Sequence, residues 1–227
     1  MKVIGISGSP RKDRSNTSKI IKTFLKGVEE ENVYSKFIDI TERDIKYCIG
    51  CDNCHKLGRC VLKDELNDLV DILYEADAFV IGSPVYVFQV SAQLKTFIDR
   101  LTHQLHCQRF LGKKAVVVTT SGGGYGEKEV INYLKDFLNM TGVFVVSELK
   151  KTIQDTKVLI DNNDEFLAYV RKEAKKFVSI LKGDYSDQDQ LEKMKNFRDI
   201  IGAVIKERRD DWPFEYEYFL KKGWFNS

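Results

Sequence analysis

Four of the five cysteines lie between positions 48 and 60, close enough along the chain to bind one metal centre. They are Cys48, Cys51, Cys54 and Cys60, and their spacing is C-x2-C-x2-C-x5-C. Thiolates this close together suit a [4Fe–4S] cluster, because one compact loop can wrap around a cubane. A zinc site usually takes its two ligand pairs from separate segments, which makes zinc the weaker metal alternative. The remaining alternative is a loop of free thiols.

A second chemical signal is the polar loop of residues 7–18, SGSPRKDRSNTS, between an apolar run and a helical pattern. It matches neither G-x-x-x-x-G-K-[ST] nor G-x-G-x-x-G, so neither a nucleoside triphosphate nor a dinucleotide is indicated. A helix N-terminus supplies unpaired N–H groups and the positive end of the helix dipole. Side-chain donors beside it come from Ser9, Arg11, Ser15, Asn16 and Thr17. We predict a site for a terminal monophosphate, the alternative being a turn that only caps the helix.

Two further loops follow predicted strands, residues 82–86 (GSPVY) and residues 119–124 (TTSGGG). The carboxyl ends of parallel strands meet at one edge of a sheet, so both loops should lie beside the phosphate loop. Pro84 and Tyr86 offer a rigid and an aromatic surface for a flat ring, and the glycines allow close backbone approach. A phosphate site with two ring-contacting loops describes a pocket for flavin mononucleotide (FMN).

Other polar residues near these motifs are assigned no catalytic role. His55 is expected to be a solvated neighbour of the cysteines, and His103 and His106 are expected at the surface or at an interface, because their spacing matches no closed zinc pattern. Asp99 and Arg100 are expected to form a helix-end ion pair. Hydride transfer to a flavin needs no side-chain base, so no catalytic acid or base is predicted.

Alternating apolar and helical patterns predict the elements that position these loops. The predicted strands are residues 2–7, 33–40, 78–82, 113–120 and 143–147. The predicted helices are residues 15–30, 64–74, 91–102, 127–139 and 164–181, with Asp64 and Ser91 as N-caps. Such alternation implies parallel βαβ units in an α/β sheet covered on both faces. Right-handed crossovers leave two common doubly wound strand orders, one of which is 2-1-3-4-5.

The composition shifts after Lys182, which divides the chain into residues 1–182 and a C-terminal extension, residues 183–227. The extension begins with a polar linker, continues as a charged helix over residues 191–209 and ends in an aromatic stretch. That stretch contains Trp212, Phe214, Tyr216, Tyr218, Phe219, Trp224 and Phe225. So many aromatic rings are expected to pack on the domain or on a neighbouring subunit.

Composition narrows the classes of function. The 227 residues are 43% hydrophobic, and 36 basic against 34 acidic residues give a net charge of +2. This balance offers no single-sign field for nucleic acid, and no apolar run is long enough to suggest a membrane partner. The N-terminal MKVIGIS enters a strand pattern directly and lacks the features of a signal peptide, so a cytoplasmic location is predicted.

The motifs together resemble those of the NAD(P)H-dependent FMN reductase and iron-sulfur flavoprotein family. The resemblance covers about residues 1–180 and rests on SGSPR with SNT, GSPVY, LKTFIDR at residues 94–100, and the first three cysteines. It implies a flavodoxin-like three-layer sandwich whose five-stranded parallel sheet has the order 2-1-3-4-5. It also implies bound FMN and a homodimer, or a homotetramer built from dimers, with the helix of residues 91–100 in the dimer interface.

The same resemblance assigns roles to residues. Those that would hold the FMN phosphate are Ser9, Arg11, Ser15, Asn16 and Thr17. Those that would line the isoalloxazine ring are Pro84, Val85 and Tyr86, with Ser121, Gly122 and Gly123 on its other side. The compact cysteine motif, Cys48, Cys51, Cys54 and Cys60, resembles the cluster-binding motif of the iron-sulfur flavoproteins, and in the family each flavin can lie near a cluster of a neighbouring subunit.

The predicted function is an FMN-dependent oxidoreductase that moves electrons from NAD(P)H or ferredoxin to a small-molecule acceptor, with a [4Fe–4S] cluster as relay. Three alternatives remain open. They are a non-enzymatic flavin electron carrier, a cluster-free NAD(P)H:FMN or quinone reductase, and a flavin-bound regulatory or scaffolding protein.

Overall fold

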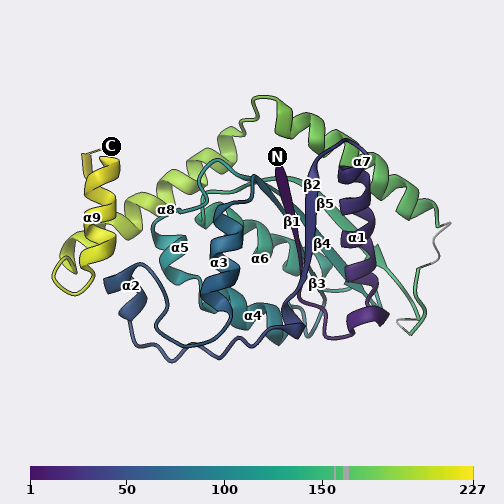
Figure 1. The fold of residues 1–227 in the computed structure, drawn as a ribbon, viewed down its shortest axis with the longest axis horizontal. Coiled ribbons are helices and arrows are strands. Elements are labelled where there is room, and N and C mark those ends of the chain that lie inside the picture. The colour runs from purple at the N-terminus through teal and green to yellow at the C-terminus, as the bar shows by residue number, and fades with distance from the viewer. Residues whose placement is uncertain (156, 161–163, 227) are drawn as a thin grey trace.

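Five parallel strands form the centre of the computed structural model (Figure 1), which describes residues 1–155, 157–160 and 164–226. The strands are β1 (Lys2–Ser7), β2 (Tyr34–Asp39), β3 (Ala78–Pro84), β4 (Lys114–Ser121) and β5 (Phe144–Thr152). Their order in the sheet is β2-β1-β3-β4-β5, and all neighbours pair in parallel. The predicted 2-1-3-4-5 order is therefore confirmed.

The register of the sheet brings the polar loops to one edge. Ser7 at the end of β1 lies opposite Gly82 on β3, and Pro84 at the end of β3 lies opposite Thr120 on β4. The loops that follow these three strands therefore leave the sheet side by side, as the sequence predicts.

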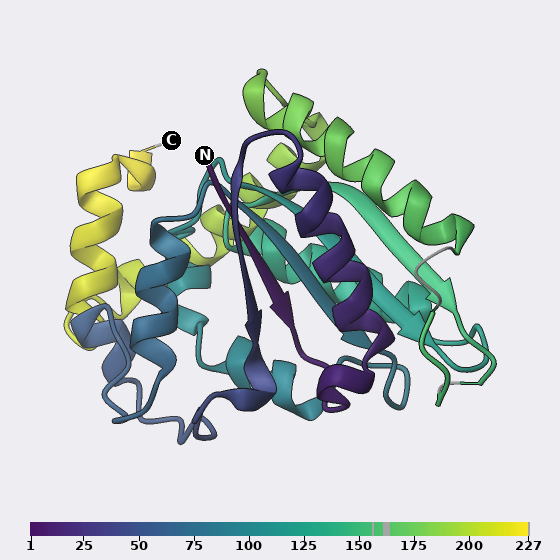
Figure 2. The same cartoon turned by 45° about the vertical axis from the view of Figure 1, so that its right-hand side comes forward.

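Helices cover both faces of the sheet (Figure 2). They are α1 (Asn16–Glu29), α2 (Asn53–Leu57), α3 (Leu66–Tyr74), α4 (Ala92–Asp99), α5 (Thr102–His106), α6 (Glu127–Met140), α7 (Glu165–Lys182), α8 (Gln188–Glu207) and α9 (Pro213–Lys222), with short 3-10 turns at Lys12–Arg14, Ile40–Glu42 and Trp224–Asn226. Helices α1 and α7 share one core, in which the rings of Phe24 and Phe177 meet at 5.5 Å. Helices α3, α4 and α6 share the core on the opposite face, through residues such as Leu66, Phe97 and Leu134.

Several boundaries differ from the predicted ones. Strand β5 runs to Thr152 instead of residue 147, because the alternation of exposed Glu148, buried Leu149 and exposed Lys150 continues the strand along the edge of the sheet. The helix predicted over residues 91–102 ends at Asp99 as α4, and the short helix α5 that follows it, Thr102–His106, was not predicted. The cysteine segment, residues 48–60, contains the short helix α2, and the aromatic stretch contains α9. Neither of these helices was predicted.

The C-terminal extension packs on the domain of its own chain. The side-chain amide of Gln190, in α8, donates to the Val145 carbonyl at 3.0 Å and accepts from the Val145 N–H at 2.7 Å. Gln190 also accepts from Asn139, at the end of α6. These bonds satisfy backbone groups of the edge strand β5 and fix the start of α8. The chain then runs to α9, which lies beside α2 at the left of Figure 1.

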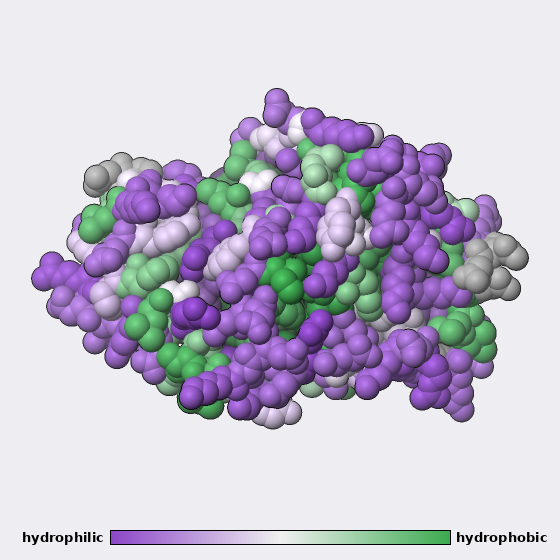
Figure 3. All heavy atoms as spheres, viewed as in Figure 1, coloured by the Kyte–Doolittle hydropathy of each residue, from purple (hydrophilic) through white to green (hydrophobic). Residues whose placement is uncertain are grey.

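The face shown in Figure 3 is largely hydrophilic, with hydrophobic residues in separate patches. Within the described part of the chain, no helix combines the length and hydrophobicity that a membrane span requires.

Candidate functional site

A pocket opens at the edge of the sheet where β1, β3 and β4 end. Its lining consists of Ser9, Arg11, Asn16, Thr17, Pro84, Val85, Tyr86, Thr120, Ser121, Gly122 and Ile153. Every predicted FMN contact except Ser15 and Gly123 is in this set. Thr120 and Ile153 were not predicted; the position of Thr120 beside the predicted loop was the only signal in the sequence.

The first turn of α1 shows how the polar loop is fixed. The Ser15 hydroxyl accepts from the Ser18 N–H at 2.9 Å, so Ser15 caps the helix and does not line the pocket. The Asn16 side chain donates to the Val158 carbonyl and accepts from the Ile160 N–H, both at 2.8 Å. What faces the pocket at this end is therefore the helix N-terminus together with the hydroxyl and guanidinium groups of the loop.

Gly8 lets the polar loop lie directly against α4. A Cβ atom at this position would stand 2.4 Å from Cβ of Leu94, so only glycine fits. The Ser91 hydroxyl donates to the Gly8 carbonyl and also accepts from the Leu94 N–H, which makes it the N-cap of α4. The polar loop and α4 are thus held together by one serine.

The other end of the pocket is apolar. The Val85 N–H donates to the Thr120 carbonyl at 2.8 Å, which joins the second loop to the third. Tyr86 is 42% exposed and starts a tight turn in which Val87 and Phe88 have φ of +49° and +60°. Left-handed backbone at a β-branched residue is strained, and strain of this kind concentrates at binding sites. No sequence pattern signalled this turn.

A second hollow is lined by all four clustered cysteines. Cys48 and Cys51 are exposed, whereas Cys54 and Cys60 are half-buried. Left-handed backbone at Gly50 (φ +62°) winds the loop before Cys51. The segment therefore bends beside the hollow that its four cysteines line.

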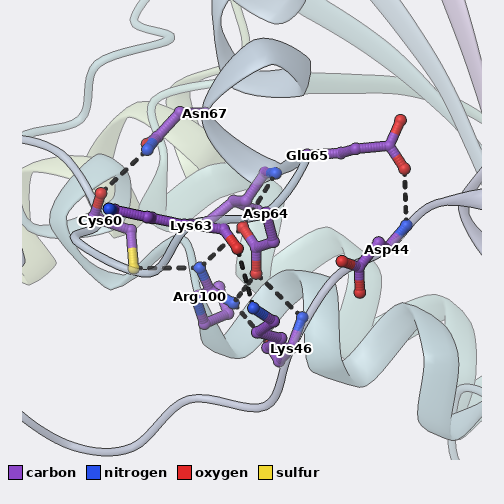
Figure 4. Close-up of polar contacts among 9 residues, drawn as sticks. Asp44, Lys46, Cys60, Lys63, Asp64, Glu65, Asn67 and Arg100 are labelled. Carbon is purple, nitrogen blue, oxygen red and sulfur yellow. Dashed lines mark hydrogen bonds and ion pairs between the residues drawn. The ribbon is translucent and has the colours of Figure 1, made fainter.

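Arg100, at the end of α4, lies in this hollow and its contacts differ from the prediction (Figure 4). It does not pair with Asp99, whose carboxylate pairs with Lys95 instead. The Arg100 guanidinium pairs with buried Asp64 and donates to the sulfur of Cys60. Asp64 also accepts from the Leu66 N–H at 3.2 Å, so it keeps part of its predicted capping role although the helix begins after Glu65.

The predictions for His55 and His106 are wrong, because both side chains are buried around Glu215 of α9. His55 Nδ1 lies 2.6 Å from one carboxylate oxygen of Glu215, and His106 Nδ1 lies 3.0 Å from the other. Burial alone would lower the pKa of His55, but hydrogen bonds with Cys54 and Glu215 raise it to about 10. Burial likewise opposes the charge of Glu215, and hydrogen bonds from the two histidines keep the pKa of this carboxyl below its usual range.

These three residues are, within the described part of the chain, the one group of three potential metal ligands whose ligand atoms all lie within 4.8 Å of one another. Their geometry favours a hydrogen-bonded bridge over a metal site. The two imidazole rings stack at 5.0 Å with an interplanar angle of 22°, so their in-plane lone pairs do not converge on one point. Each ring instead meets a different oxygen of the same carboxylate.

His103 and Cys107 are also buried, contrary to the expected surface or interface position of His103. Burial, with a smaller contribution from Arg109, lowers the pKa of His103 to about 4. Burial raises the pKa of the Cys107 thiol, which leaves this fifth cysteine an inert part of the core.

Known proteins match both the domain and the whole chain. A family model described as NADPH-dependent FMN reductase matches residues 1–155. An iron-sulfur flavoprotein of Archaeoglobus fulgidus is 29% identical over 223 residues, which are 98% of this chain and 99% of that protein. An iron-sulfur flavoprotein of Clostridioides difficile is 30% identical over 204 residues, 88% of each chain. Among solved structures, a flavodoxin from the domain Archaea superposes with a TM-score of 0.54 at 16% identity, covering 81% of this chain and 100% of that one.

Proposed function

The chain belongs to the NADPH-dependent FMN reductase family and is an FMN-dependent oxidoreductase, and from that premise we propose the path that its electrons take. Electrons travel from NADPH, NADH or ferredoxin, by way of FMN at the carboxyl edge of the sheet and a [4Fe–4S] cluster at the cysteine segment, to a small-molecule acceptor. The observation that carries the proposal is the convergence of three strand ends on one pocket, polar at the α1 end and apolar at the Tyr86 end.

The residues of the pocket fit the parts of FMN. Arg11, Ser9 and Thr17, with the N-terminus of α1, would bind the phosphate. Pro84, Val85 and Tyr86 would contact one side of the flavin ring, and Ser121 and Gly122 the other. When bound, FMN supplies two-electron exchange with a nicotinamide and one-electron exchange with a cluster. The role of the protein would be to bind the phosphate and to hold the ring at the half-open end of the pocket beside Tyr86, which is 42% exposed.

The cysteine segment fits a cluster better than a single zinc ion. Tetrahedral zinc with Zn–S bonds of 2.3 Å needs thiolates only about 3.8 Å apart. No three of the four cysteine sulfurs, all of which lie in the described part of the chain, come within 4.8 Å of one another. A cubane needs more widely spaced thiolates, and the proposal of a cluster is supported by the hollow that all four cysteines line. The names of the two relatives support the same reading.

Exposed apolar side chains beside the pocket support the proposed homodimer or homotetramer. Val87 is 93% exposed, Tyr125 80% and Phe88 58%; Val87 and Phe88 directly follow the loop of residues 82–86, and Tyr125 directly follows the loop of residues 119–124. Apolar groups gathered at one edge are typical of a surface that a partner covers. Sedimentation of the wild type and of Val87→Asp tests this: the variant should shift toward monomers, and a wild type that sediments as a monomer would contradict the proposal.

Anaerobic mixing with electron donors tests the donor side of the proposal. The purified protein is mixed separately with NADPH, NADH and reduced ferredoxin, and the flavin absorbance is followed in time. We expect rapid bleaching with a nicotinamide. Bleaching with ferredoxin alone would make the enzyme ferredoxin-linked, and a flavin that no donor reduces would contradict the proposed function.

Metal analysis tests the cluster. Anaerobically purified protein should contain about four iron and four sulfide per chain. Cys54→Ser should lose most of this iron, whereas Cys107→Ala, which removes the buried fifth thiol, should keep it. Absence of both iron and sulfide from the wild type would rule out the cluster and leave the segment with free thiols.

A further inference from the structure

The Arg100 side chain is a buried cation that contacts a cysteine of the proposed cluster site. Its Nη2 lies 3.1 Å from Sγ of Cys60, within hydrogen-bond distance for sulfur. The residue is 3% exposed, and it lines the same hollow as the four cysteines. Its buried Nε has no hydrogen-bond partner among the described residues. The guanidinium therefore brings a permanent positive charge to the side of one thiol.

The position of the guanidinium is fixed by a second set of contacts (Figure 4). Nη1 lies 2.8 Å and Nη2 3.2 Å from the two oxygens of Asp64, which forms a two-bond fork. Nη1 also donates to the Lys46 carbonyl at 2.5 Å. Lys46 precedes the first cysteine and Asp64 follows the last one. Arg100 thus ties both ends of the cysteine segment to α4 and aims one donor at a sulfur.

A second arginine, Arg109, holds the same segment without contacting a cysteine sulfur. Comparing the two arginines therefore separates anchoring of the segment from contact with a sulfur. Nη1 of Arg109 donates to the Gly58 carbonyl at 3.0 Å, and its guanidinium lies 4.7 Å from the ring centroid of Tyr74. If anchoring the segment were all that mattered, Arg100 and Arg109 would be equivalent. Of the two arginines, Arg100 is the one that adds charge and a hydrogen bond at a cysteine sulfur.

Hydrogen bonds and positive charge at cluster sulfurs stabilise the reduced, more negative form of an iron–sulfur cluster. We propose that Arg100 is the positioning residue that raises the reduction potential of the cluster, through its hydrogen bond to Cys60 and its charge. The inference rests on the proposed function, because it requires a cluster at the four cysteines.

Redox potentiometry of the holoprotein, followed by electron paramagnetic resonance, tests the assignment. In Arg100→Gln the one-electron reduction equilibrium of the cluster should become about tenfold less favourable, a fall of about 59 mV. Arg100→Lys, which keeps the charge but not the fork, should show a smaller fall. Arg109→Gln is the matched control and should leave the cluster potential unchanged. The FMN potential should be unchanged in all three variants, because Arg100 and Arg109 do not line the FMN pocket.

The possible contrary results are distinct. A cluster potential in Arg100→Gln and Arg100→Lys equal to that of the wild type, at full iron content, would overturn the role of Arg100 and leave the proposed function intact. An equal fall in Arg109→Gln would also overturn it, because the effect would then come from loosening the segment. Iron loss in both Arg100 variants but not in Arg109→Gln, with FMN retained, would assign Arg100 an anchoring role through Asp64 and Lys46 in place of the tuning role, and would overturn the proposal. A wild type without iron would overturn this inference together with the cluster.

Discussion

Arg11 is the one charged side chain among the described residues that line the proposed FMN pocket. A charge-assisted hydrogen bond contributes about 1.5–3 kcal/mol, so Arg11→Gln should weaken FMN binding by about tenfold to a hundredfold. Riboflavin lacks the phosphate, so its affinity should not change. Fluorescence titration of the apoprotein with each ligand measures both effects.

Arg14, three positions further along the same loop, provides the matched control. It is exposed and does not line the pocket. Arg14→Gln should therefore leave both affinities unchanged. If Arg11→Gln weakened riboflavin as much as FMN, the phosphate would not bind where we place it.

Because His103 is buried, the folded protein should become less stable in acid. Folding lowers the pKa of His103 from 6.5 to about 4, so between these pH values the unfolded chain binds a proton that the folded protein does not. The free energy of unfolding is therefore highest above pH 6.5 and falls as the pH drops toward 4. The loss is about 1.4 kcal/mol per pH unit within that window. His103→Gln should remove this slope, as measured by urea unfolding of both proteins at pH 7.5 and pH 5.0. Identical pH dependence in the two proteins would show that His103 does not titrate in this way.

At the scale of elements, Gly58 ends helix α2 and allows α9 to approach it. Its φ is +69°, and a Cβ atom would stand 2.3 Å from the ring of Phe214. Gly58→Ala should therefore destabilise the contact between α2 and α9 and reduce the iron content, without changing FMN affinity.

Gly223 allows the backbone cost to be separated from the clash. It has the same φ of +69°, but a Cβ atom there would meet nothing within 4 Å. Gly223→Ala should lower the free energy of unfolding by about 1 kcal/mol, because of the left-handed conformation alone. Gly58→Ala should lower it by clearly more, because the new Cβ atom also meets the Phe214 ring. Equal changes in the thermal unfolding midpoint of the two variants would mean that the Phe214 ring can move away from the new Cβ atom without loss of stability.

The sequence predicts elements whose signals are local, and it misses those that depend on distant contacts. Apolar runs, helical spacing and right-handed crossovers predict the parallel sheet and the loops at the carboxyl ends of its strands, and most residues of the proposed FMN pocket lie in these loops. The strand order required the family resemblance, because the crossovers alone leave two common orders. The burial of His55 could not be predicted, because it depends on Glu215, which lies 160 positions away. The same holds for Arg100, whose partner Asp64 reads in the sequence as a helix cap.

At the scale of the whole molecule, the C-terminal extension is coupled to the cysteine segment through Glu215. The carboxylate is fully buried and joins His55 of α2 to His106 of α5, while the Trp212 ring stacks on His55 at 4.3 Å. Removing one member of a buried charged pair costs about 3–5 kcal/mol. Glu215→Gln should lower the free energy of unfolding by about that amount and reduce iron retention, and FMN affinity should stay unchanged.

Glu217 lies two residues further along α9 and is exposed, so Glu217→Gln should change stability by less than about 0.5 kcal/mol. Urea unfolding and iron analysis of the two variants make the comparison. If Glu215→Gln kept the stability and the iron content of the wild type, Glu215 of the C-terminal extension would not hold α2 in place.

In the proposed function one chain carries two redox groups, an FMN at the sheet edge and a cluster at the cysteine segment. Anaerobic reductive titration of the purified protein counts the electrons that each chain accepts. We predict about three electrons per chain, two for FMN and one for a [4Fe–4S] cluster. A chain that accepts only two, with the spectrum of a flavin alone, would contradict the cluster, and a chain that accepts none would contradict both redox groups.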